Sequence, residues 1–238
     1  YLSDLERYDE ADDAYESALA CDDPWKACVR MNQAIMWNRR GEHDRAIAQL
    51  RALDEPILDL QIKSSLVYAL KEAGRADEAV SLAEELLASE LDDPDDDDRI
   101  ALANVAAEMA ELQLAEGRSR QDVRRLLLDA IARYGPDQAG PLFAMLRELD
   151  IRTSSKAKYM RLFLHGELTR EAPPELASST GYYVNYDVVA DSKADALAMA
   201  QEIEDVCGFT DRLSIEKVKV LRRRWSEPIG VYSRSGMF

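Results

Sequence analysis

Two stretches of the sequence repeat one pattern: Gly41-Glu-His-Asp-Arg-Ala46-Ile-Ala-Gln-Leu50-Arg-Ala-Leu53 and Gly74-Arg-Ala-Asp-Glu-Ala79-Val-Ser-Leu-Ala83-Glu-Glu-Leu86. In each stretch an alanine stands five residues after a glycine, and apolar residues follow four and seven residues later. An earlier stretch carries the same spacing, so the key alanines Ala11, Ala46 and Ala79 lie 35 and 33 residues apart. Apolar residues at these intervals form one stripe along a helix.

A further helical run precedes each glycine, over Trp25 to Arg39 and over Leu60 to Ala73. We expect Gly41 and Gly74 to end these helices, because glycine takes a positive φ without steric cost. The recurrent alanine lets the second helix of each pair pack closely against the first. A single pair cannot bury its own stripe, so the pairs are expected to stack.

At these positions the sequence resembles the tetratricopeptide repeat family. The second unit matches the family at Ala34, Trp37, Gly41, Ala46, Leu50 and Leu53. The third unit matches it at Leu66, Leu70, Gly74, Ala79, Ala83 and Leu86, and a half unit at the start matches it at Leu5, Tyr8, Ala11, Tyr15 and Ala18. The sequence departs from the family at Val67, in a small-residue position, and at Glu6, in place of the turn glycine. The resemblance covers about residues 1–89 and implies a right-handed superhelix of stacked antiparallel helix pairs.

The acidic run of residues 92–99 begins a less regular region. Its aspartates alternate as in an EF-hand loop, but Asp98 stands where that loop needs glycine and Asn104 where it needs a bidentate glutamate. We therefore predict a solvated acidic loop and no metal site. Two further helix pairs are expected, over residues 100–116 with 119–134 and over 137–150 with 154–168.

The pattern changes after a linker that is rich in proline, serine and threonine, at residues 171–181. Tyr182 to Ala190 is aromatic and β-branched and predicts a strand, and Ser192 with Asp195 opens a helix that ends at Gly208. Ser214 to Arg223 and Pro228 to Ser233 predict two more strands.

The predicted fold class is therefore mostly α. A tetratricopeptide-like helical domain over residues 1–170 is followed by the linker and by a small α+β domain of order β-α-β-β over residues 182–238. The chain starts at Tyr1 in what reads as the middle of a unit, so we expect the N-terminus to be truncated, and a removed signal peptide stays open.

The net charge of the chain bears on the kinds of partner that it can bind. The chain has 46 Asp and Glu against 30 Lys and Arg, a net charge of −16. Nucleic-acid binding and docking on anionic membranes depend on basic residues, so neither is expected of so acidic a chain. The three cysteines form no CxxC pair, which favours small buried side chains and a cytoplasmic location.

The sequence contains no motif of a nucleotide-binding loop, a hydrolase or a zinc enzyme. The two histidines, His43 and His165, are expected to pack between helices and to lie near a helix C-terminus, respectively. Arg222-Arg223-Arg224-Trp225 is the one basic cluster with an aromatic neighbour, and we interpret it as a strand end that pairs with acidic helices. No catalytic residue, cofactor or metal is predicted, so the chain is not expected to be an enzyme.

The resemblance also implies a binding surface, because in that family the first helix of each pair lines a concave groove. The positions that face this groove are Met31, Ile35, Asn38, Gln61, Ser64, Tyr68 and Lys71. A non-catalytic adaptor is thus expected, which binds a peptide or helix of a basic or mixed-charge protein. The apolar residues Met31 and Ile35 argue against the subtype that clamps the carboxylate tail of chaperones.

Two other functions stay open from the sequence. In the first, the C-terminal α+β domain is an enzyme or a ligand-sensing module that the repeats position. A deep pocket with convergent polar groups in residues 181–238 would favour it. In the second, the chain is a structural subunit of a larger assembly.

Overall fold

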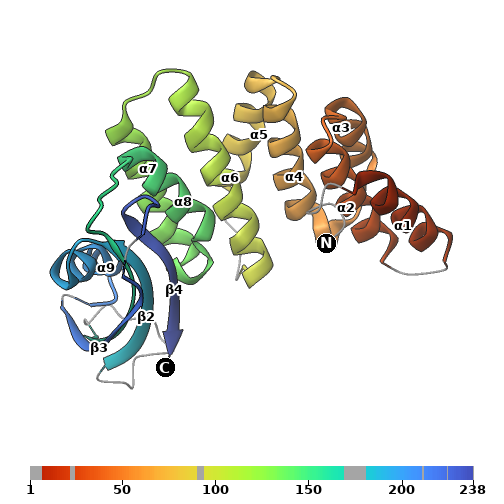
Figure 1. The fold of residues 1–238 in the computed structure, drawn as a ribbon. Helices are drawn as coiled ribbons and strands as arrows, with labels where there is room; N and C mark the ends of the chain where they lie inside the picture. The colour runs from red at the N-terminus through yellow and green to blue at the C-terminus, as the bar shows by residue number, and fades with distance from the viewer. Residues whose placement is uncertain are drawn as a thin grey trace. The chain divides into compact units, whose positions relative to one another are not determined.

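The structure is a computed structural model, and it describes residues 7–21, 25–89, 94–168, 181–210, 212–223 and 225–237. The chain is mostly helical and carries a small four-stranded antiparallel sheet (Figure 1). It divides into two compact units, residues Tyr1–Leu112 and Gln113–Phe238. None of the described helices is both long enough and apolar enough to cross a membrane.

The first unit is built from helices, each of which packs on the next from α1 to α5. These elements are α1 (Tyr8–Ala20), α2 (Lys26–Arg39), α3 (His43–Ala52), the 3-10 turn η2 (Pro56–Leu58), α4 (Asp59–Glu72), α5 (Ala76–Ala88) and α6 (Asp96–Ala115), which runs past the boundary at Leu112.

The predicted helix ends are confirmed at Gly41 and Gly74, which have φ values of +88° and +73°. The two turns are built alike: the N–H of the residue after each glycine donates to the carbonyl five residues before it, Glu42 to Trp37 and Arg75 to Leu70, both at 2.9 Å. A side chain would be strained at this backbone conformation, so glycine is required at both turns.

The repeated alanines lie in the core as predicted. Ala34, Ala46 and Ala79 have no exposed surface and Ala11 is 3% exposed, and they pack in one cluster around Trp37, Leu50 and Leu70. The acidic run ends in a helix start, because the Asp95 carboxylate accepts the Asp98 N–H at 2.9 Å. Asp92 and Asp93 lie outside the described residues, as do Asp23 and Pro24.

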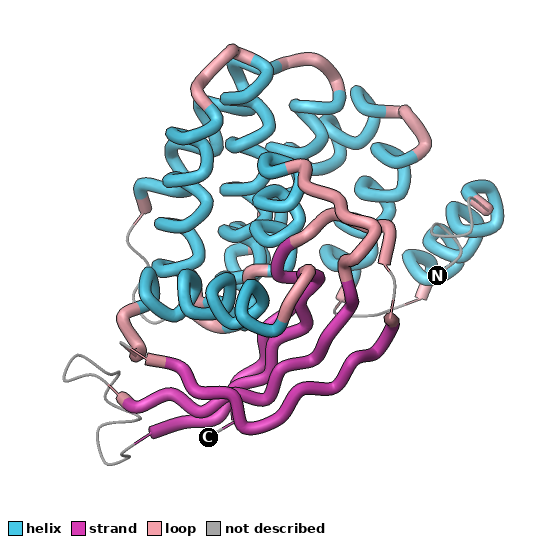
Figure 2. Tube along the Cα trace, turned by 60° about the vertical axis from the view of Figure 1, so that its left-hand side comes forward, coloured by secondary structure: helices cyan, strands magenta, loops and turns pink. Residues whose placement is uncertain are grey.

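The second unit places three helices beside a sheet of strand order β3-β1-β2-β4. Its elements are α7 (Arg120–Tyr134), the 3-10 turn η3 (Pro136–Gln138), α8 (Gly140–Asp150), β1 (Lys158–Glu167), β2 (Gly181–Ala190), α9 (Lys193–Cys207), β3 (Leu213–Arg222) and β4 (Gly230–Met237). Helix α9 crosses one face of the sheet (Figure 2) and packs on α7. The predicted ends of α9 are confirmed, since Ser192 Oγ accepts the Asp195 N–H and Gly208 has φ +69°.

The helix predicted over residues 154–168 is wrong, because this segment forms strand β1. Met160, Leu162 and Leu164 alternate onto the buried face, and Arg161 between them is exposed. β1 pairs antiparallel with both β2 and β3, so it is a central strand of the sheet.

The strand also changes the predicted domain organisation. The sheet has a strand ahead of the predicted β-α-β-β order, and a boundary at residue 170 would separate β1 from its partners. The compact units divide instead between Leu112 and Gln113. Most of the predicted linker, residues 171–180, lies outside the described residues.

Candidate functional site

The predicted groove residues lie on α2 and α4, in the first unit. Two of them, Asn38 and Ser64, are buried. The other five are half-buried: Met31, Ile35, Gln61, Tyr68 and Lys71. Asn38 and Ser64 therefore present little surface to a partner.

Helix α4 contacts α6 with a constant register of 37 residues. Gln61 Nε2 donates to Asp98 Oδ1 at 3.2 Å, and Ser64 Oγ donates to the Ala101 carbonyl at 3.1 Å. Lys71 Nζ lies 2.5 Å from Glu108 Oε2. These contacts show that α6 lies against α4. The next turn glycine with a positive φ, Gly117, lies 43 residues after Gly74, compared with 33 residues between Gly41 and Gly74.

Lys71 is surrounded by three carboxylates, those of Glu72, Glu108 and Glu111. The Tyr68 ring lies beside it, 5.4 Å from the ammonium. Burial lowers the pKa of Lys71, but the hydrogen bonds to Glu108 and Glu111 outweigh burial, and the pKa is raised overall. Burial raises the pKa of Glu108 despite the nearby ammonium. We name these five residues the Lys71 cluster; its one ammonium and three carboxylates, when ionised, sum to a charge of −2.

Two amide side chains near this surface have an atom without a partner among the described residues. Asn38 Oδ1 contacts His43 Nδ1 at 2.7 Å, whereas its Nδ2 is buried and has no hydrogen bond. Gln61 Oε1 is buried and has none either. Buried polar atoms are rarely left without a partner, so these two atoms are exceptions among the described residues. The contact of His43 with Asn38 also places His43 between α2 and α3, as expected.

A separate apolar cavity of about 220 Å³ opens elsewhere on this unit. Trp25 and Ile57 line it and are 66% and 84% exposed. Exposed large apolar side chains around a cavity are typical of protein contacts. Neither residue falls on a groove position, so the repeat pattern did not point to this pair.

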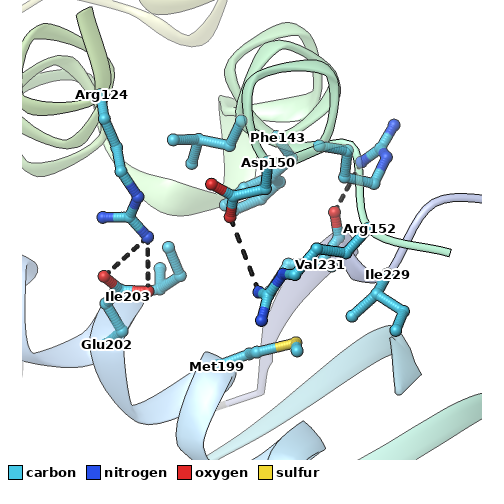
Figure 3. A pocket seen from close by; sticks show the side chains of 12 residues that line it. Arg124, Phe143, Asp150, Arg152, Met199, Glu202, Ile203, Ile229 and Val231 are labelled. Atoms are coloured by element: carbon cyan, nitrogen blue, oxygen red, sulfur yellow. Dashed lines mark hydrogen bonds and ion pairs between the residues drawn. The ribbon is translucent and has the colours of Figure 1, made fainter. Parts of the chain in front are cut away.

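The second unit contains an open cleft between α7, α8, α9 and β4 (Figure 3). Arg124 faces Glu202 across it, at 2.8 Å, and Asp150 faces Arg152 at 3.7 Å (Figure 3). An outer cavity of about 610 Å³ shares Arg152 and Glu202 with an inner one of about 50 Å³.

The backbone at the rim of this cleft is strained. Ile151, between Asp150 and Arg152, has φ +37°, which a β-branched residue rarely adopts. Arg124 and Glu202 neutralise each other, as do Arg152 and Asp150, and none of the residues that line the two cavities is Ser, Thr, Cys or His. The lining residues therefore include no hydroxyl or thiol nucleophile.

Two residues singled out in the sequence lie on the sheet. His165 was expected at a helix C-terminus, but it lies in β1, 5.1 Å from the Tyr183 ring. Arg222 ends β3 as predicted, and its guanidinium lies over the Trp225 ring at 4.9 Å. Arg224 lies outside the described residues.

Within the described part of the chain, no group of three His, Cys, Asp or Glu side chains is arranged to hold a metal ion. Cys21 is exposed, contrary to the expectation of buried thiols, whereas Cys28 and Cys207 are half-buried. No family model, curated protein or solved structure matches this chain.

Proposed function

We propose that the helical unit is a non-catalytic adaptor that binds a basic segment of a partner protein. The Lys71 cluster is the observation that carries the proposal. One ammonium cannot neutralise three carboxylates, so the cluster attracts a second cation. The Tyr68 ring beside the carboxylates offers a face for an arginine or lysine of the partner.

The surrounding surface supports the same type of ligand. Residues 1–112 carry 28 Asp and Glu against 11 Lys and Arg, a net charge of −17. This field accelerates the approach of a basic partner more than it strengthens the final complex.

We also propose a tetratricopeptide-like right-handed superhelix for this unit. The identical turns at Gly41 and Gly74, the buried alanines and the register of α4 on α6 support it. In such a stack α2, α4 and α6 are the first helices of successive pairs, and the Lys71 cluster joins two of them.

Fluorescence anisotropy tests the proposal on the full chain. The probe is a short fluorescein-labelled peptide of alternating arginine and alanine, and the matched peptide carries glutamate in place of arginine. Only the basic peptide should bind. Raising the ionic strength to about 0.15 M should weaken the complex.

Variants then locate the site. Glu111→Gln and Tyr68→Ala should each weaken binding about two- to fivefold. Glu84→Gln is the matched control, because it removes the same charge from an exposed position on α5. If Glu84→Gln weakens the complex as much as Glu111→Gln, binding follows net charge and the proposed site is wrong.

A further inference from the structure

We infer that the open face of the four-stranded sheet binds single-stranded RNA. This face is defined by the side chains of β1 that alternate away from α9, namely Tyr159, Arg161, Phe163 and His165, and by their neighbours on the other strands. We call it the open sheet face. It belongs entirely to the second unit, and the proposal is independent of the adaptor site on α4 and α6.

The two faces of the sheet differ sharply in burial. On the helix side Leu162, Leu164 and Val184 have no exposed surface. On the opposite side the Arg161 side chain is 53% exposed and Tyr183 is 43% exposed. Figure 2 shows a helix lying along one face of the strands, in agreement with this difference.

Three aromatic rings meet on the open sheet face. Phe163 on β1 and Tyr183 on β2 stack with 5.1 Å between ring centroids and 6° between planes. The His165 ring lies 5.1 Å from Tyr183. Phe and Tyr rings on the solvent side of a sheet are the platform on which proteins stack unpaired bases. A merely structural sheet face would more commonly be polar.

A second aromatic group lies further along β1. Tyr159 stacks on Trp225 at 5.0 Å, and Arg222 lies over Trp225. Tyr159 and Phe163 are four residues apart on one strand, about 13 Å. Tyr159 and Trp225 also pack on the buried Ala157, Val189 and Ile229. This second group therefore anchors one end of the row, and Phe163 with Tyr183 is the stacking position.

Edge strand β3 places basic residues beside this line of rings. In the register, Lys217 lies opposite Phe163, Lys219 opposite Arg161, and Arg222 opposite Tyr159. Lys217, Lys219 and Arg222 are all exposed. A positively charged row parallel to an aromatic row is the arrangement that holds the phosphates of a strand whose bases stack.

Among the described residues of the open sheet face, Asp187 is a buried carboxylate, and it is already neutralised. Asp187 accepts hydrogen bonds from Arg161 Nε and Nη2 at 2.7 and 2.8 Å. The acidity of the whole chain belongs to the other unit, because residues 113–238 carry 19 Lys and Arg against 18 Asp and Glu, a net charge of +1. The sequence-based expectation against nucleic acid used the net charge of −16, which does not describe this unit.

Neutral polar side chains on β2 and β4 lie beside the aromatic rings of the open sheet face, and they favour RNA over DNA. Asn185 lies opposite Phe163 on β2, and Ser235 lies opposite Asn185 on β4. An amide and a hydroxyl both donate and accept hydrogen bonds, as a ribose 2′-hydroxyl requires.

The test is fluorescence anisotropy with the full chain and a fluorescein-labelled single-stranded RNA of mixed sequence. Phe163→Ala and Tyr183→Ala should each raise the Kd at least about fivefold. The double variant Lys217→Gln with Lys219→Gln should reduce the slope of log K against log salt by about 0.7 for each lysine. Tyr8→Ala is the matched control, since it removes a half-buried tyrosine ring from α1 in the acidic unit, and it should leave the Kd unchanged.

Circular dichroism checks that each variant keeps the parent secondary structure, and Phe163→Leu keeps apolar bulk without a ring. A folded Phe163→Leu protein that binds RNA as tightly as the parent overturns the proposal, as does the absence of any RNA binding at low salt. Equal affinity for the DNA strand of the same sequence overturns the assignment to RNA. If the lysine variants weaken RNA binding but the Phe163 and Tyr183 variants do not, the surface is a non-specific contact for polyanions. This result also overturns the proposal.

Discussion

Glu204 and Arg234 form an ion pair in the interior of the second unit. Arg234 Nε donates to Glu204 Oε1 at 2.8 Å, and the side chains are 3% and 0% exposed for Arg234 and Glu204. The hydroxyls of Tyr182 and Tyr186 donate to the same carboxylate, and Asp137 accepts from Arg234 Nη1 at 2.7 Å. The pair thus joins α9, β2, β4 and η3 through satisfied hydrogen bonds.

Removing the cation alone should destabilise the protein strongly. Arg234→Met leaves the Glu204 carboxylate buried without a counter-charge, which should cost about 3–5 kcal/mol in the free energy of unfolding. The double variant Arg234→Met with Glu204→Gln should recover part of this loss, because no buried charge remains. Urea titration of both variants measures the difference. If Arg234→Met is as stable as the double variant, the unpaired Glu204 charge is not the cause of the loss, and the prediction is wrong.

We expect Lys71 to stabilise the fold in addition to its proposed part in binding. Lys71→Met leaves Glu108, whose side chain is 19% exposed, without its hydrogen-bonded ammonium. We expect a loss of about 1–3 kcal/mol in the free energy of unfolding. Lys63→Met is the control on the same helix, since Lys63 pairs with Asp59 near the surface, and it should change stability by less than about 1 kcal/mol. Equal losses in the two variants would refute a special role for Lys71.

The three thiols should react at very different rates. Burial and the nearby Glu204 carboxylate raise the pKa of Cys207 to about 12, whereas Cys21 is exposed. Because the thiolate is the nucleophile, iodoacetamide at about pH 8 should modify Cys21 quickly and Cys207 only after unfolding. Peptide mapping by mass spectrometry identifies the modified residue, and Cys21→Ser removes the fast phase. Rapid modification of Cys207 in the native protein would contradict the structure.

Features set by local chemistry were predictable from the sequence. The glycines at 41 and 74, the alanines that repeat after them and the Ser192 cap of α9 each act within a few residues, and all lie where expected. Strand β1 was not predictable in this way. Its segment contains Leu and Met at intervals that also suit a helix, and its identity is set by pairing with β3, about 50 residues later in the chain.

The candidate site also contains residues that the sequence predicts and residues that it does not. The position of Tyr68 and Lys71 on α4 follows from the repeat, but their partners Glu108 and Glu111 do not, because the next turn glycine, Gly117, lies 43 residues after Gly74 and no longer 33. The open sheet face was missed because its aromatic rows form only when β1 and β2 pair.

Asp187 should make the free energy of unfolding depend on pH. Its side chain is 9% exposed, and it accepts hydrogen bonds from Arg161 and from the Tyr159 hydroxyl. Burial acts to raise its pKa, but Arg161 and Tyr159 outweigh burial and hold the pKa below its ordinary value. A pKa that is lower in the folded state than in the unfolded state contributes stability above the unfolded pKa, and this contribution is lost as the pH falls through the folded pKa.

Asp187→Asn should therefore be less stable than the parent at about pH 7, by about 1 kcal/mol, since solvent screens the half-exposed Arg161. The difference should shrink below about pH 4, where the parent carboxylate also begins to take up a proton. Urea titrations of both proteins at about pH 7 and about pH 3 measure it. Asp191→Asn, which removes an exposed carboxylate from the same unit, is the control. A deficit in Asp187→Asn that persists unchanged at low pH would show that shape, and not charge, makes Asp187 important.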